Sequence, residues 1–248
     1  MLIKNQTSNQ LTFKDGRFYT DENGNYFPSA TTLLEAYPKP AQLIMWMKEV
    51  GNKADEIRDA AGKRGSSVHQ LTEDYDEGIE CTLLDEYGKP KYSLEEWAMF
   101  ERYVEFTKNH QPEHHLIEQT FISSGLGFAG TIDRVCTIDG KTYVLDIKTS
   151  NGIYNSYWLQ LAAYRELYNA SVIDSNMPKI DGVAILWLNA KTRTNGKKGD
   201  VQGKGWQMVS EMDTSKQWGL FQAVQQLWHA EHEDDKPKEF SYQLSHKK

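Results

Sequence analysis

The sequence predicts an α/β fold in which helices flank a mixed central β-sheet. Residues 130–164 read as a strand, a tight turn, a second strand and a helix, because Asp139-Gly140 tolerates the positive φ of a hairpin turn. Three further strand-like segments, at residues 115–123, 181–189 and 206–212, lie among helical patterns and turn-forming loops. This alternation of strands and helices favours a sheet that is covered on both faces.

The length and composition predict one domain that carries additional secondary-structure elements at one end. The 248 residues are 39% hydrophobic and 12% aromatic, which supplies a sizeable core. We divide the chain into an N-terminal elaboration at residues 1–61, a main core at residues 62–235 and a polar tail at residues 236–248. Without a long apolar run or a signal-peptide region, the chain predicts a cytoplasmic protein with no membrane partner.

The N-terminal elaboration begins with strands and continues with helices. Residues 11–28 alternate apolar and polar side chains around two turn signals and predict a small β-meander. Residues 41–61 predict a helix whose apolar face we expect to pack in the core; this face comprises Leu43, Ile44, Met47 and Val50. Glycines at 62 and 65 then predict a break before a second helix over residues 68–78.

Two later helices carry recognisable start signals. Ser93 and Glu96 form a capping box ahead of an apolar helical pattern. Asp213 precedes an amphipathic helix over residues 214–233. We expect both helices to be structural.

The second strand of the hairpin, in the segment YVLDIKT, ends with two opposite charges. Because side chains alternate along a strand, Asp146 and Lys148 share one face and Ile147 points to the other. Burial of a charged side chain costs free energy, so such residues usually have an ionic or hydrogen-bonding partner or serve a function. One interpretation is a divalent-cation site, with Asp133 and Asp146 as carboxylate ligands and Lys148 beside them. The alternative is a salt bridge of Asp146 with Lys148 or Arg134.

The ordered segments GTIDRV, DIKT and QLAAY resemble the PD-(D/E)XK nuclease superfamily. The most similar branch is that of RecB-type exonucleases, which includes the mitochondrial genome maintenance exonuclease and phage exonucleases. The resemblance implies a restriction-endonuclease-like αβββαβ core. It also implies a metal-binding Asp133, a catalytic triplet at residues 146–148, and catalytic roles for Gln160 and Tyr164. Ile132 stands where the superfamily name has proline.

The same resemblance extends to residues 64–69, because RGSSVH is similar to a G-T-x-x-H motif whose histidine binds metal. His69 would then join Asp133, Asp146 and the Ile147 carbonyl around Mg²⁺ or Mn²⁺. Without the resemblance, His69 is an ordinary surface or capping histidine. Glu118 is a further catalytic candidate on the preceding strand, or else a surface carboxylate. The helix start beside Gly65 could receive a phosphate.

Any DNA contact must come from local features, because the net charge is −7 and phosphate binding draws on basic surface. Near the motifs, the candidates are Lys63, Arg64, Ser66 and Tyr157. A basic glycine-rich stretch supplies Lys191, Arg193, Lys197 and Lys198. The charged candidates could equally be solvated surface residues. Cys81 and Cys136 are too few for the four-cysteine iron–sulfur cluster of some relatives.

The function hypothesis is a Mg²⁺- or Mn²⁺-dependent exonuclease that hydrolyses DNA from its ends. It would act on single strands or strand ends in replication, repair or recombination, with a partner protein from such a pathway. The sequence leaves the oligomeric state open. One alternative is a structure-specific endonuclease with the same fold, and another is a catalytically silent DNA-binding or assembly module.

Overall fold

A six-stranded mixed sheet forms the centre of the molecule in the order β1-β5-β6-β7-β8-β9. The computed structural model describes residues 3–4, 10–13, 16–172, 176–189, 205–233 and 237. The strands of this sheet are β1 (Ile3–Lys4), β5 (Glu113–Ser123), β6 (Phe128–Ile138), β7 (Lys141–Lys148), β8 (Gly182–Trp187) and β9 (Gln207–Glu211). The expected mixed α/β fold is confirmed.

Strand direction follows from the connections. β5, β6 and β7 form an antiparallel meander, whereas β8 pairs parallel to β7. Parallel neighbours need a crossover, and α5 (Asn155–Ser171) supplies it. β9 then returns antiparallel to β8. Together with a helix before β5, this order gives the αβββαβ core that the resemblance implies.

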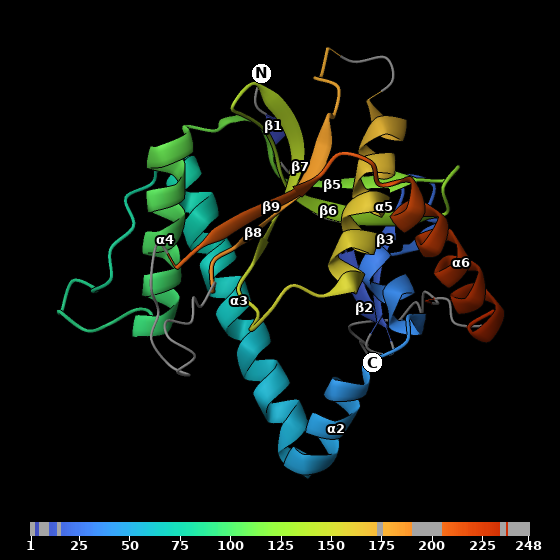
Figure 1. Ribbon diagram of the computed structural model, residues 1–248, viewed down its shortest axis with the longest axis horizontal. Coiled ribbons are helices and arrows are strands. Elements are labelled where there is room, and N and C mark those ends of the chain that lie inside the picture. Colours follow the sequence, from blue (N-terminus) through green and yellow to red (C-terminus); the bar gives the residue numbers. More distant parts are fainter. Residues whose placement is uncertain are drawn as a thin grey trace, which may run out of the picture.

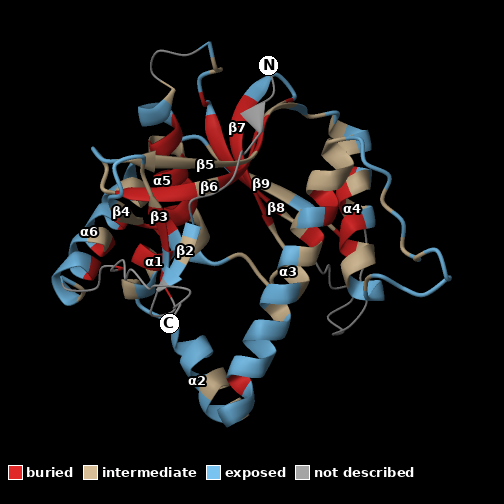
Figure 2. Ribbon diagram, turned by 180° about the vertical axis from the view of Figure 1, so that it is seen from behind, coloured by how far each residue is buried: buried red, intermediate tan, exposed pale blue. Residues whose placement is uncertain are grey.

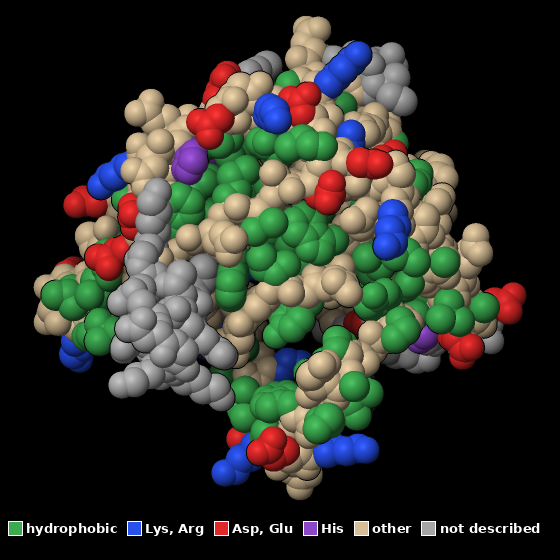
Figure 3. Space-filling view, viewed as in Figure 1, with side chains coloured by type: hydrophobic (Ala, Val, Ile, Leu, Met, Phe, Trp, Pro, Cys, Tyr) green, Lys and Arg blue, Asp and Glu red, His purple; other side chains and the backbone are tan. Residues whose placement is uncertain are grey.

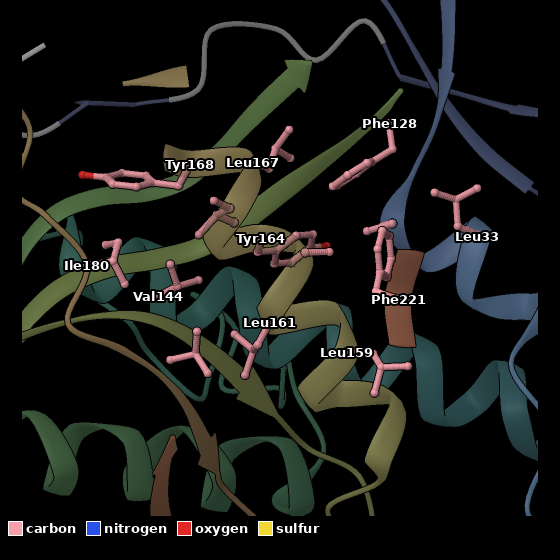
Figure 4. Packing of buried hydrophobic residues seen from close by; sticks show 14 of the residues in the cluster. Leu33, Phe128, Val144, Leu159, Leu161, Tyr164, Leu167, Tyr168, Ile180 and Phe221 are labelled. Atoms are coloured by element: carbon pink, nitrogen blue, oxygen red, sulfur yellow. The ribbon is translucent and has the colours of Figure 1, made fainter. Parts of the chain in front are cut away.

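Helices cover both faces of the sheet (Figure 1). α5 and α6 (Ser215–Glu231) lie over one face, and α3 (Ala54–Asp76) and α4 (Leu94–His110) lie over the other. Each face has its own cluster of buried side chains. Val144 of β7 belongs to the α5 cluster (Figure 4), whereas Leu145 and Ile147 belong to the α3–α4 cluster. Ile147 therefore points away from the α5 face, as alternation predicts.

A second sheet of three strands packs beside the first. It consists of β2 (Gln10–Phe13), β3 (Gly16–Thr20) and β4 (Tyr26–Pro28), paired antiparallel. The following short helix α1 (Ala30–Leu33) is capped by the Ser29 hydroxyl, which accepts from the Thr32 N–H. Buried Tyr19 hydrogen-bonds through its hydroxyl to Thr131 of β6 at 3.0 Å, which ties the two sheets together. The predicted meander is confirmed.

The expected helix break at residues 62–67 is wrong. The chain breaks instead at Gly51, after α2 (Ala41–Val50) and before the short 3₁₀ segment η2 (Gly51–Lys53). Gly51 has φ 61°, a conformation that favours glycine, so it ends α2 readily. Gly62 and Gly65 lie within continuous α3, where each costs roughly 1 kcal/mol relative to alanine, and the buried face of α3 outweighs that cost.

The expectation that α2 packs in the core is also wrong. None of its residues is buried, and Leu43 and Ile44 are 39% and 43% exposed. α2 and the first half of α3 project from the body of the molecule, and exposed residues dominate the projection (Figure 2). Hydrophobic side chains are visible on its surface in Figure 3. Periodicity identified a common face correctly, but it cannot say whether a partner covers that face.

No helix among the described residues is both long enough and apolar enough to cross a bilayer. The predicted boundary between residues 61 and 62 lies within α3, which runs without a break from Ala54 to Asp76. Except for residue 237, the predicted tail of residues 236–248 lies outside the described part of the chain.

Candidate functional site

Three potential metal ligands from three elements meet at one point. They are His69 of α3, Glu118 of β5 and Asp133 of β6, and one ligand atom from each lies within 4.8 Å of the others. The His69 Nδ1 atom is 3.6 Å from Asp133 Oδ2 and 3.6 Å from Glu118 Oε1. Two carboxylates and an imidazole form a donor set that suits a hard or borderline divalent cation.

Asp133 is positioned by the separation of β6 and β7. The backbone pairing of these strands runs from Ile138 and Lys141 to Arg134 and Leu145, and it ends there. Two residues beyond Leu145, the Ile147 N–H donates to Asp133 Oδ2 at 2.8 Å. A side-chain carboxylate therefore replaces a backbone acceptor and fixes the Asp133 side chain in a buried place.

Glu118 reaches the same place through an irregular backbone. Its φ is 44°, which is uncommon for a residue with a side chain and costs on the order of 1 kcal/mol or more. It lies between the paired positions Ile117–Arg134 and Gln119–Ile132, opposite Asp133. Such a local departure from regular strand geometry redirects a side chain, here toward His69.

His69 also contacts the end of β7. Its Nε2 atom lies 3.0 Å from the Ile147 carbonyl oxygen. That separation suits a hydrogen bond from the Nε2–H group to the carbonyl, while Nδ1 faces the two carboxylates. Burial disfavours the charged imidazole, but Asp133 and Glu118 outweigh it and raise the pKa of His69 to about 9. At neutral pH without metal, His69 carries a proton that a cation must displace.

Asp146 and Lys148 lie on the α5 face beside this cluster. The Lys148 Nζ atom is 2.6 Å from Asp146 Oδ2, and both side chains are largely buried. Burial raises the pKa of the Asp146 carboxyl to about 6, although the Lys148 ammonium opposes this effect. Burial alone would lower the pKa of Lys148, but Asp146 and Asp133 raise it overall. Of the two salt-bridge partners considered for Asp146, the structure gives Lys148 and excludes Arg134.

Two residues of α5 hold Lys148 in place. The Lys148 ammonium donates to Gln160 Oε1 at 3.2 Å, and Gln160 Nε2 in turn donates to the Tyr164 hydroxyl at 3.0 Å. Gln160 and Tyr164 are one helical turn apart, so their side chains stack along the same face of α5. These two hydrogen bonds connect buried Tyr164, through Gln160, to the Lys148 side chain that faces Asp146.

Gly130 explains how Tyr164 fits against the sheet. A Cβ atom at position 130 would lie 2.5 Å from Tyr164 Cε1, which is closer than real contacts allow. The glycine of the GTIDRV segment therefore provides room for the ring. This packing role was not part of the sequence interpretation.

Sequence reasoning missed a buried ionic network behind the cluster. The Arg134 side chain is fully buried, its Nε donates to Asp76 Oδ2 at 2.7 Å, and its Nη1 is 3.3 Å from Glu118 Oε1. Tyr103 donates its hydroxyl to the same Asp76 oxygen at 2.6 Å. Asp76 follows Val68 and Thr72 at intervals of four residues, and that spacing on the buried face of α3 could have revealed it.

Two of the three DNA-binding candidates on α3 have local partners for their side chains. Arg64 forms a 3.3 Å ion pair with Glu95, and the Ser66 hydroxyl donates to the Gly62 carbonyl at 3.2 Å. Lys63 lies in the middle of the helix with them. The expected phosphate site at a helix start beside Gly65 is wrong, because the N–H groups there belong to a continuous helix.

The Tyr157 ring lies 4.5 Å from the Lys148 ammonium, so it borders the cluster. The basic candidates Lys191, Arg193, Lys197 and Lys198 lie outside the described residues.

Comparison with known families gives one match. The model of the PD-(D/E)XK nuclease superfamily matches residues 45–241, which is most of the chain. The match includes every element that contributes to the cluster. No curated protein matches the chain.

We expect Gly130→Ala to destabilise the protein by about 1–3 kcal/mol, because the new methyl group must displace the Tyr164 ring. Gly62→Ala is the matched control, since nothing lies within 4 Å of its Cβ position and alanine favours a helix. Urea unfolding of both variants measures the difference. Equal stability of the two variants would contradict the packing role of Gly130.

We expect Asp76→Ala to cost about 3–5 kcal/mol of unfolding free energy, because it leaves the buried Arg134 charge without its closest partner. Asp55→Ala is the control, since the ion pair of Asp55 with Arg58 is exposed and should contribute little. Guanidinium unfolding compares them. A loss for Asp76→Ala no larger than that for Asp55→Ala would show that the network does not stabilise the fold.

We expect the affinity for Mn²⁺ to rise between pH 7 and pH 9, by up to about tenfold per pH unit. The reason is that the cation displaces a proton from His69, whose pKa is raised to about 9. Titration calorimetry at several pH values, in buffers of different ionisation enthalpy, measures both affinity and proton release. His69→Gln should bind more weakly and lose this dependence; an unchanged pH dependence in that variant would refute the assignment.

Proposed function

The chain belongs to the PD-(D/E)XK nuclease superfamily, and we propose that it is a metal-dependent exonuclease that hydrolyses DNA from its ends. The observation that carries the proposal is the convergence of His69, Glu118 and Asp133 beside the Asp146–Lys148 pair. Processing of DNA ends in replication, repair or recombination, together with a partner protein, is the setting that such an activity would serve.

The donor set fits Mg²⁺ or Mn²⁺. The carboxylates of Glu118, Asp133 and Asp146 and the carbonyl of Ile147 offer the hard oxygen ligands that Mg²⁺ prefers. The His69 imidazole adds a nitrogen ligand, which Mn²⁺ also accommodates. Burial and the neighbouring Asp133 carboxylate raise the pKa of the Asp146 carboxyl, although Lys148 and His69 oppose this effect. A divalent cation would favour the ionised form of both carboxylates.

When bound, the cation supplies Lewis-acid polarisation of the scissile phosphodiester. The side chains of the protein orient the reacting groups and stabilise the developing charge. Lys148 presents an ammonium group at the edge of the cluster, where it can orient the attacking water and offset charge that develops on the phosphate. Gln160 holds this ammonium group by its 3.2 Å hydrogen bond, and Tyr164 holds Gln160. Water adds to phosphorus and one P–O ester bond breaks, which leaves a phosphate-terminated product and a hydroxyl group.

We expect Asp146→Ala to lower DNA hydrolysis by about two orders of magnitude or more, because it removes a carboxylate ligand and the partner of Lys148. The control is Asp59→Ala, since Asp59 is an exposed residue of α3. The assay uses end-labelled single-stranded, double-stranded and closed circular DNA with Mg²⁺, Mn²⁺ or EDTA. Circular dichroism checks that each variant is folded.

Trimming of linear DNA alone, dependent on metal and lost in Asp146→Ala, is the expected result. Cutting of closed circles would replace the exonuclease by an endonuclease of the same fold. Metal and DNA binding without hydrolysis would indicate a silent binding module. Full activity of Asp146→Ala would refute the proposed site.

A further inference from the structure

Two tyrosines lie next to each other beside the Lys148 ammonium. Tyr157 borders Lys148, with 4.5 Å between the ammonium nitrogen and the ring centroid. Tyr154 packs edge-on against Tyr157, with 5.3 Å between ring centroids and an interplanar angle of 80°. Tyr154 is 44% exposed, whereas Tyr157 is partly buried. The rings of Tyr154 and Tyr157 therefore form a continuous aromatic surface, here called the aromatic step, that runs from the buried Asp146–Lys148 pair to the exterior of the protein.

The segment that carries Tyr154 is held at several points. It connects β7 to α5 and passes between α3 and α5 in Figure 1. Trp187 at the end of β8 donates its indole N–H to the Ser150 carbonyl at 2.7 Å. Asn189 donates to Asn151 Oδ1 at 3.3 Å, and Ile153 packs against the hydrophobic core. The aromatic step is thus largely preorganised, which lowers the entropic cost of binding.

The charges near the cluster favour a contact that does not depend on phosphate attraction. Lys148 pairs with Asp146, Arg134 with Asp76 and Arg64 with Glu95. These three cationic side chains already face carboxylates, and the chain as a whole has a net charge of −7. Stacking of a base on an aromatic ring, by contrast, needs no positive surface and tolerates every base.

We propose that Tyr154 and Tyr157 form a stacking subsite for a base next to the scissile phosphate, so that the substrate strand enters the site single-stranded. A base within a duplex is already stacked on its neighbours, so only a single strand or a frayed end can place one against Tyr154. This inference rests on the proposed function and makes it more specific. It assigns Tyr154 a role in strand selection and in affinity, with little sequence preference.

The test measures DNA binding in an Asp146→Asn background, which slows hydrolysis. The probes are single-stranded oligonucleotides with one abasic position, moved stepwise from the labelled end. We expect Tyr154→Ala to raise the Kd for intact DNA by about tenfold, which is within the range for loss of one stacked base. At one position, the abasic penalty should be about tenfold when Tyr154 is present and less than about twofold in the Tyr154→Ala variant.

Two further variants separate stacking from general effects. Tyr154→Phe keeps the ring and should bind like the parent. Tyr87→Ala removes an aromatic side chain that is 77% exposed in a different loop, and it should bind like the parent as well. In active protein, Tyr154→Ala should lose more activity on single strands than Tyr87→Ala does, through KM more than through kcat.

The outcomes separate this inference from the proposed function. An abasic penalty that is equal with and without the Tyr154 ring at every position would overturn the stacking subsite, even if the parent protein degrades DNA. Equal weakening by Tyr87→Ala would overturn it too. A parent protein that neither binds nor hydrolyses DNA would overturn both the subsite and the proposed function.

Discussion

One buried hydrogen bond, from the Ile147 N–H to the Asp133 carboxylate, determines the geometry of the whole cluster. It forms where the pairing of β6 and β7 ends, so it satisfies a backbone donor that the ladder no longer serves. The same bond directs Asp133 toward His69 and fixes the position of Ile147, whose carbonyl contacts His69 Nε2. Asp146 and Lys148 flank Ile147 in sequence, and therefore the position of the pair depends on this bond as well.

The cluster and the adjacent Asp146 bring three carboxylates together, and this arrangement must be stable before any cation binds. The structure meets this requirement with internal positive charges. Lys148 faces Asp146, protonated His69 lies between Glu118 and Asp133, and Arg134 approaches Glu118 from behind. Arg134 keeps its charge at all relevant pH values, whereas His69 can give up its proton to a metal. The permanent charge of Arg134 therefore stabilises the fold, whereas a metal cation can replace the proton of His69.

The sequence is most informative where a local rule has only one outcome. Side-chain alternation is enough to place Asp146 and Lys148 on one face of β7, and the turn at Asp139-Gly140 is enough to predict the hairpin that brings Asp133 near them. The resemblance adds His69, which lies far away in the chain.

Local rules fail where tertiary contacts determine the structure. Gly62 looks like a helix break, yet α3 continues through it because Val68 of α3 packs with buried residues of the sheet. The Asp76–Arg134 pair joins distant segments, and no local pattern identifies its partner.

The close fit of Gly130 against Tyr164 has a consequence for the evolution of this fold. Position 130 can accept a side chain only when residue 164 becomes smaller or adopts a different rotamer, because the two share one volume between β6 and α5. The two positions should therefore covary among relatives, with glycine at 130 accompanying a large ring at 164. Libraries that vary either position alone would sample mostly defective proteins, whereas libraries that vary both together could find new packings with the lysine still held.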